Sequence, residues 1–77
     1  METLRIGKST QGRAGKTVTV VQGFTRDRAL LERLASELKR SLGCGGSCRT
    51  GIVELQGDVR DRVRPLLEAK GFRLKGR

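Results

Sequence analysis

The chain has 77 residues, of which 17 are Lys or Arg and 8 are Asp or Glu, so its formal net charge is +9. This length predicts a single domain over residues 1–77 with a thin core, and no run approaches the ~20 apolar residues of a transmembrane helix. The first residues lack the basic and apolar stretches of a signal peptide, so we expect a cytoplasmic protein with no membrane partner. The positive charge indicates a polyanionic partner; a merely repulsive, soluble surface is the alternative.

The N-terminal part predicts two strands joined by a basic loop. Residues 4–6 form a short strand, and residues 16–22 form a stronger one, rich in β-branched side chains, with Val18 and Val20 on the core face. The segment between them contains three glycines from Gly7 to Gly15. We expect a flexible basic loop over about residues 7–16, which either orders on a ligand or is a plain hairpin connection.

An amphipathic helix is predicted from about Arg26 to Leu42. Thr25 is its expected N-cap, and Gly43 fits the left-handed residue that ends a helix. The turn that follows leads to a short extended segment near Arg49. The apolar stripe of this helix consists of Ala29, Leu31, Leu34, Ala35, Leu38 and Leu42.

The alternating run 52–56 predicts a half-buried strand, with Val53 and Leu55 inward. Gly57 breaks the strand, and Asp58 is an expected cap for a helix over about residues 59–70. Arg60 then projects from the first helical turn.

Pro65 lies inside this second helix, where it removes a hydrogen bond and crowds the carbonyl of Asp61. This costs about 3 kcal/mol in a regular helix, so we expect a kink or an irregular first turn near Asp61. Gly71 ends the helix, and residues 72–75 alternate as a last strand.

The order of elements predicts an α+β fold, a two-layer sandwich resembling an α/β plait, with one mixed sheet and two helices packed on one face. The other sheet face should be open and carry Arg5, Arg73 and Lys75 near Thr17 and Thr19. The predicted core comprises Val18, Val20, Leu31, Leu34, Leu38, Val53, Leu55, Val63, Leu66, Leu67, Phe72 and Leu74.

The residue types argue against an enzyme and for a binder of phosphate groups. The chain has no His, so a Cys nucleophile would lack its usual base, and no cofactor is expected. The glycines at 43–46 lack the Gly-Lys-Ser/Thr of a nucleotide-binding loop. Only Phe24 and Phe72 are aromatic, so an RNA would be held through its phosphates and shape more than by base stacking.

Three segments occur in an order that resembles a known family. They read Lys-Thr-Val-Thr-Val-Val-Gln-Gly-Phe at 16–24, Cys-Gly-Gly at 44–46 and Leu-Gln-Gly-Asp-Val-Arg at 55–60. They are similar to the eukaryotic-type translation initiation factor 1 family, in its short bacterial and archaeal form, over roughly residues 12–76. The family fold, an α/β plait, agrees with the predicted order of elements.

The resemblance implies a factor that binds the small ribosomal subunit near the peptidyl site and influences selection of the start codon and initiator tRNA. Its implied partners are ribosomal RNA, mRNA and initiator tRNA, and we expect a monomer. A generic basic RNA-binding domain that acts outside initiation is the alternative. The implied RNA-binding residues are Lys8, Arg13 and Lys16 in the loop, Lys39 and Arg40 on the first helix, and Arg60. For Arg60, an ion pair with a neighbouring acid is an equal alternative.

Cys44 and Cys48 are expected to be reduced and free of metal. A zinc site would need carboxylates or a second chain, because the sequence has no His. A disulfide across the turn in an oxidising setting, and zinc shared between molecules, are the alternatives. Native mass spectrometry should therefore find neither stoichiometric zinc nor a mass two hydrogens below that of the dithiol. Either observation would contradict this prediction.

Overall fold

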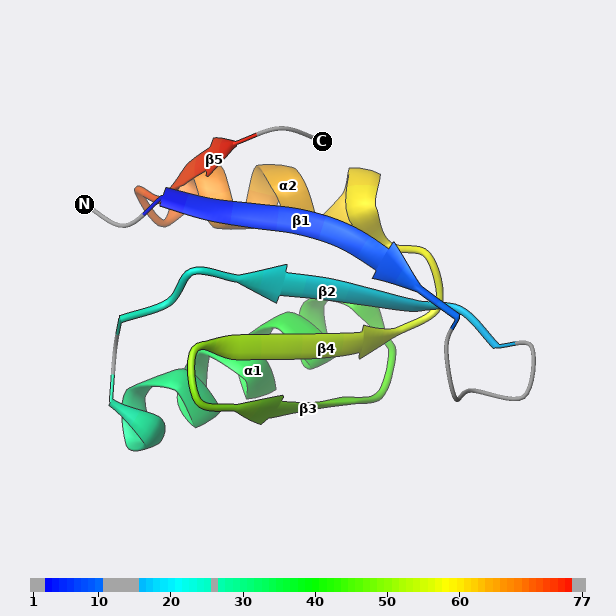
Figure 1. The fold of residues 1–77 in the computed structure, drawn as a ribbon, viewed down its shortest axis with the longest axis horizontal. Coiled ribbons are helices and arrows are strands. Elements are labelled where there is room, and N and C mark those ends of the chain that lie inside the picture. Colours follow the sequence, from blue (N-terminus) through cyan, green and yellow to red (C-terminus); the bar gives the residue numbers. More distant parts are fainter. Residues whose placement is uncertain (1–2, 11–15, 26, 76–77) are drawn as a thin grey trace.

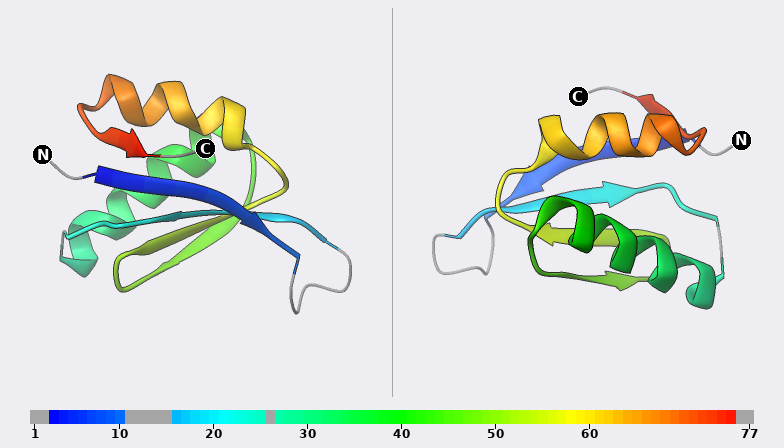
Figure 2. Two further views of the ribbon diagram at one scale, coloured as in Figure 1. Left: turned by 45° about the horizontal axis from the view of Figure 1, so that its top comes forward. Right: turned by 180° about the vertical axis from the view of Figure 1, so that it is seen from behind.

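The computed structural model describes residues 3–10, 16–25 and 27–75. The elements are β1 (Thr3–Ser9), β2 (Val18–Gln22), α1 (Arg28–Leu42), β3 (Gly46–Arg49), β4 (Ile52–Gln56), α2 (Arg60–Ala69) and β5 (Arg73–Lys75). The five strands form one sheet in the order β3-β4-β2-β1-β5, in which only β1 and β5 are parallel. Both helices cover the same sheet face (Figures 1 and 2), which confirms the predicted α+β fold. No helix in the described ranges is long and apolar enough to cross a membrane.

Strand β1 is longer than the sequence predicts. Leu4 and Ile6 are buried under the helices, as alternation requires, but antiparallel pairing with β2 continues through Lys8 to Ser9. Pairing with a neighbouring strand therefore outweighs the weak strand propensity of a segment that begins with Gly7. Gly7 and Lys8 belong to a strand and not to the predicted loop.

The predicted orientation of β2 is wrong. Thr19 and Val21 are fully buried on the helix-facing side, where Val21 pairs with Ile6 and Val53. Val18 and Val20 lie on the other face, so neither belongs to the core cluster. Both faces of this strand carry β-branched side chains, and alternation alone does not say which face is inward.

The open face carries Arg5, Arg73 and Lys75, as predicted. Arg5 lies between the buried Leu4 and Ile6 and therefore points outward, and Lys75 is its partner on β5. The expected neighbour Thr19 is instead on the buried face.

The rest of the predicted core is confirmed, with Leu66 and Leu74 only partly buried against it. Phe24 and Phe72 meet edge to face, with ring centroids 5.7 Å apart. Ala29, expected in the apolar stripe, is exposed. The prediction omitted several core residues: Leu4, Ile6, Val21, Phe24, Ala35, Leu42 and Val59.

Helix α1 begins later than predicted because Asp27, not Thr25, is its N-cap. The Asp27 Oδ1 accepts a hydrogen bond of 2.9 Å from the backbone N–H of Leu30. The C-terminal prediction is confirmed, since Gly43 has φ 67° and its N–H donates to the Lys39 carbonyl.

Helix α2 continues through Pro65 as one helix from Arg60 to Ala69. The kink or irregular first turn expected near Asp61 stays a prediction. Val63 and Leu67 are fully buried on either side of the proline, and their burial offsets the lost hydrogen bond. Val59 and not Asp58 occupies the N-cap position, without a side-chain hydrogen bond of its own, but the Asp58 Oδ1 accepts a long hydrogen bond of 3.4 Å from the backbone N–H of Arg60 in the first turn.

Candidate nucleic-acid interface

Several elements converge at one end of the sheet: the end of β1, the beginning of β2, the end of β4, the beginning of α2 and the end of α1 (Figure 1). Backbone hydrogen bonds join them, from Gly57 to the Thr17 carbonyl and from Gln56 to the Gly45 carbonyl, both 2.8 Å long. The Arg62 guanidinium donates to the Leu42 carbonyl at 3.0 Å and so joins α2 to the end of α1. We call this region the basic end; its described cations are Lys8, Lys16, Lys39, Arg40, Arg60 and Arg62.

The buried hydroxyl of Thr19 holds the turn at Gly57–Val59 in place. It donates to the Gly57 carbonyl and accepts from the Val59 N–H, and both distances are 2.8 Å. Gly57 has φ 84°, a left-handed conformation that other residues adopt only with strain. The hydroxyl and the glycine together fix the direction in which α2, and with it Arg60, leaves the sheet.

Arg60 forms a two-pronged ion pair with Asp58. Its Nε lies 2.8 Å from Oδ1 and its Nη2 lies 3.0 Å from Oδ2. The hydrogen bond from Arg60 is the main reason that the pKa of Asp58 lies below its ordinary value, and the charge of Lys8 also lowers it. The same pair raises the pKa of Arg60. In the free chain, Arg60 therefore makes the ion pair that the sequence left as one of two alternatives.

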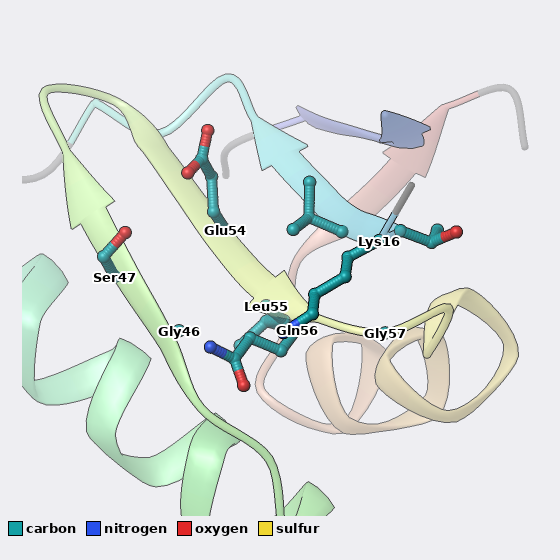
Figure 3. Close-up of a pocket in the computed structure, with 9 residues that line it drawn as sticks. Lys16, Gly46, Ser47, Glu54, Leu55, Gln56 and Gly57 are labelled. Atoms are coloured by element: carbon teal, nitrogen blue, oxygen red, sulfur yellow. The ribbon is translucent and has the colours of Figure 1, made fainter. Parts of the chain in front are cut away.

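Lys8 and Lys16 flank this turn from β1 and β2. Lys8 is exposed and is the register partner of Thr19, which brings it near Asp58. Lys16 lines a depression of about 580 Å³ on the open face together with Gln56 and Gly57. Figure 3 shows its side chain extending toward Gln56. The structure thus places Lys8, Lys16 and Arg60 around one turn, with Lys16 on the open face and Lys8 on the helix-facing side, while Arg13 lies outside the described residues.

Lys39 and Arg40 occupy the last turn of α1, where the helix dipole favours cations. Arg40 lines the groove between α1 and α2, beside the Glu37–Lys70 ion pair of 2.6 Å. The hydrogen bond from Lys70 is the main cause of the lowered pKa of Glu37, to which Arg40 also contributes. Lys39 and Arg40 therefore belong to the helical layer and not to the turn around Arg60.

Arg62 is a residue of the basic end that the sequence did not single out. Its contact is with the Leu42 carbonyl at the end of α1, 20 positions away along the chain. No local pattern signals such a contact.

Cys44 and Cys48 are free thiols, half-buried against the core. Within the described ranges, no group of three or more His, Cys, Asp or Glu residues could hold a metal ion. The redox and metal prediction for these thiols stays a prediction. The chemistry that the basic end offers is a set of cations around a rigid turn, which suits phosphate groups.

Comparison with known proteins gives one family and several close relatives. The family model described as translation initiation factor SUI1 matches residues 1–73. The protein YciH of Escherichia coli K12 is 49% identical over 72 residues, covering 94% of this chain and 67% of its own length. The protein translation factor SUI1 homolog of Sulfolobus acidocaldarius is 49% identical over 65 residues, 84% of this chain and 66% of the relative. The homolog from Pyrococcus horikoshii is 44% identical over 62 residues, 80% of this chain and 63% of the relative.

Replacing Thr19 by Val should destabilise the protein although the side chain keeps its shape. The Gly57 carbonyl and the Val59 N–H lose their partner, at about 1–3 kcal/mol each, so the free energy of unfolding should fall by roughly 2–6 kcal/mol in urea denaturation. Thr19→Ser retains the hydroxyl and should lose less. Thr17→Val, at a half-buried position just before β2, is the matched control and should change stability by at most about 0.5 kcal/mol. Equal losses for the two valine variants would show that the hydroxyl does not hold the turn.

The Asp58–Arg60 pair predicts a pH effect with a defined sign. The pKa of Asp58 is lowered in the folded chain, so the pair stabilises the fold above the unfolded-state pKa. That contribution disappears as the pH falls through the folded-state pKa. In an NMR titration of side-chain carboxyl carbons, Arg60→Gln should raise the pKa of Asp58 toward its ordinary value. Glu37, whose lowered pKa depends on Lys70, is the internal control and should not move. An unchanged Asp58 titration would contradict the pairing.

Proposed function

We propose that this chain, which belongs to the SUI1 family of translation initiation factors, binds the small ribosomal subunit near the peptidyl site and influences selection of the start codon and initiator tRNA. Membership of the family supports a role in translation initiation. Ribosomal RNA is the proposed direct partner, with mRNA and initiator tRNA adjacent, and the chain is proposed to act as a cytoplasmic monomer without enzymatic activity.

The observation that carries the proposal is the grouping of Lys8, Lys16 and Arg60 around a turn that a buried hydroxyl keeps rigid. Cations on a rigid frame bind phosphates with little loss of conformational entropy. Each phosphate they neutralise releases condensed counterions, so the affinity should fall as salt rises.

Arg60 can form both an ion pair with Asp58 and a contact with an RNA phosphate. Its pair with Asp58 is partly exposed, with side-chain exposures of 35% and 43%, so solvent screens the attraction. A phosphate presents the same two-oxygen geometry to a guanidinium as a carboxylate does. We therefore expect Arg60 to exchange Asp58 for an RNA phosphate on binding.

Lys39 and Arg40 extend the proposed interface onto the helical layer. They lie in the last turn of α1, the element whose end Arg62 fixes against α2. Their position relative to the turn is therefore set by the fold. A surface with two layers of cations fits the groove and backbone of structured RNA, which proteins recognise mainly by shape.

Substituting Arg13 and Lys16 together by Gln should weaken binding to purified small subunits in sedimentation. The slope of log affinity against log salt should flatten by about 0.9 for each phosphate contact removed. Arg28→Gln with Arg33→Gln removes the same charge from exposed positions in the first half of α1 and should leave the slope unchanged.

One outcome would contradict the proposed loop contact, and another would contradict the proposed ribosomal role. If the Arg13/Lys16 variant is folded and binds with unchanged affinity and slope, the loop does not contact RNA. If the unmodified chain shows no preference for small subunits over an equal mass of unrelated RNA, the generic RNA-binding alternative is the better account.

A further inference from the structure

A second group of cations lies on the open sheet face, away from the basic end. We call Arg5, Arg73 and Lys75 the sheet patch. Strand β5 pairs with the first half of β1, so that Arg5 is the register partner of Lys75, and Arg73 that of Thr3. Figure 1 shows β5 and the beginning of β1 at the opposite end of the sheet from the turn between β4 and α2. All three cations project from the face that the helices do not cover.

No acid within the described ranges neutralises the sheet patch. None of its three residues takes part in an ion pair or a side-chain hydrogen bond there. Some other surface cations do contact a carboxylate, namely Arg28, Arg49 and Lys70. Like charges on neighbouring strands repel, so this arrangement opposes folding unless an anion binds.

The sheet patch borders a depression of about 450 Å³ that is lined by both polar and apolar groups. Arg5 and Lys75 supply two cations, Thr3 a hydroxyl and Gln22 a carboxamide. These are the side-chain groups that proteins use to hold phosphate oxygens, the guanidinium with two parallel hydrogen bonds and the ammonium as a point charge. No aromatic side chain lines the depression, so it offers no surface for base stacking.

We propose that the sheet patch is a second RNA-binding surface, which holds the phosphodiester backbone of a segment distinct from the one at the basic end. Arg5 and Lys8 lie on the same strand but on opposite faces of the sheet, since Lys8 pairs with the inward Thr19. The chain measures 35 Å along its longest axis. Lys16 of the basic end does lie on the open face, but it precedes the start of β2, whereas Arg5 pairs with Gln22 at the end of that strand. A short RNA backbone segment therefore does not span both surfaces, and the protein would connect two segments. This inference does not depend on the ribosomal assignment.

The test maps binding of an RNA hairpin of arbitrary sequence to the full ¹⁵N-labelled chain by NMR. Saturable amide shifts are expected at Thr3, Arg5, Gln22 and Lys75, in addition to those at the basic end. Arg5→Gln with Lys75→Gln should abolish the first set and leave the second. The Arg28→Gln/Arg33→Gln variant is the charge-matched control and should retain both sets. Shifts confined to the basic end in the unmodified chain would overturn the proposal.

Two control ligands distinguish binding of RNA at the sheet patch from binding of other anions. Poly-L-glutamate at the same charge concentration, and inorganic phosphate at the same phosphate concentration, should produce no saturable shifts at the sheet patch. Equal shifts with either would mean that an acidic protein or a small anion, and not RNA, is the ligand. The thermal midpoint of the RNA-free Arg5→Gln/Lys75→Gln variant should be unchanged or raised, because the substitutions relieve repulsion. A lower midpoint would assign these side chains to the fold and overturn the proposal.

Discussion

The buried hydroxyl of Thr19 is the contact on which the rest of this small structure depends. It is the only polar side chain among the described residues that is buried with the core, and it satisfies one donor and one acceptor of the turn between β4 and α2. Without it, two backbone groups at the edge of the core would lack partners. The turn it fixes determines where α2 starts, and so places Val63 and Leu67 over the sheet.

The turn that Thr19 holds also determines where several charged side chains lie. The turn sets Arg60 and Asp58 beside Lys8, and the contact from Arg62 to Leu42 places the end of α1 next to them. The helical layer is stabilised separately by the Glu37–Lys70 pair. Several acids of this chain thus pair with cations that order the fold. The excess of positive charge remains on the surfaces that we propose to face an anionic partner.

The alternating and helical patterns predicted most of the fold correctly, and the failures have identifiable causes. In residues 52–56, Val53 and Leu55 share one face, while the other face carries Glu54 and Gln56 beside Ile52, and the burial of Val53 and Leu55 was predicted correctly. Residues 18–22 are β-branched on both faces, so the inward face depended on a tertiary hydrogen bond of Thr19 that a pattern cannot reveal. Thr25 and Asp27 are both good helix caps, and only the side-chain contact to Leu30 decides between them.

The candidate site was predictable only in part, because some of its contacts join residues that no local sequence pattern relates. The resemblance and the charge indicated Lys16 and Arg60, but not that Arg60 would be paired with Asp58, because an arginine in a first helical turn can point either way. Arg62 was missed because its partner is distant in sequence. Lys8 was expected in a loop, yet pairing with β2 places it on a strand.

Hydroxyl-radical footprinting of the chain on purified small ribosomal subunits tests the central claim most directly. The account predicts protection of ribosomal RNA at the peptidyl site. Cleavage from a probe tethered at position 16 should reach the same nucleotides, while a probe at position 28, at the far end of α1, should cut elsewhere or not at all. Absence of protection at the peptidyl site, or identical cleavage from both positions, would contradict the account.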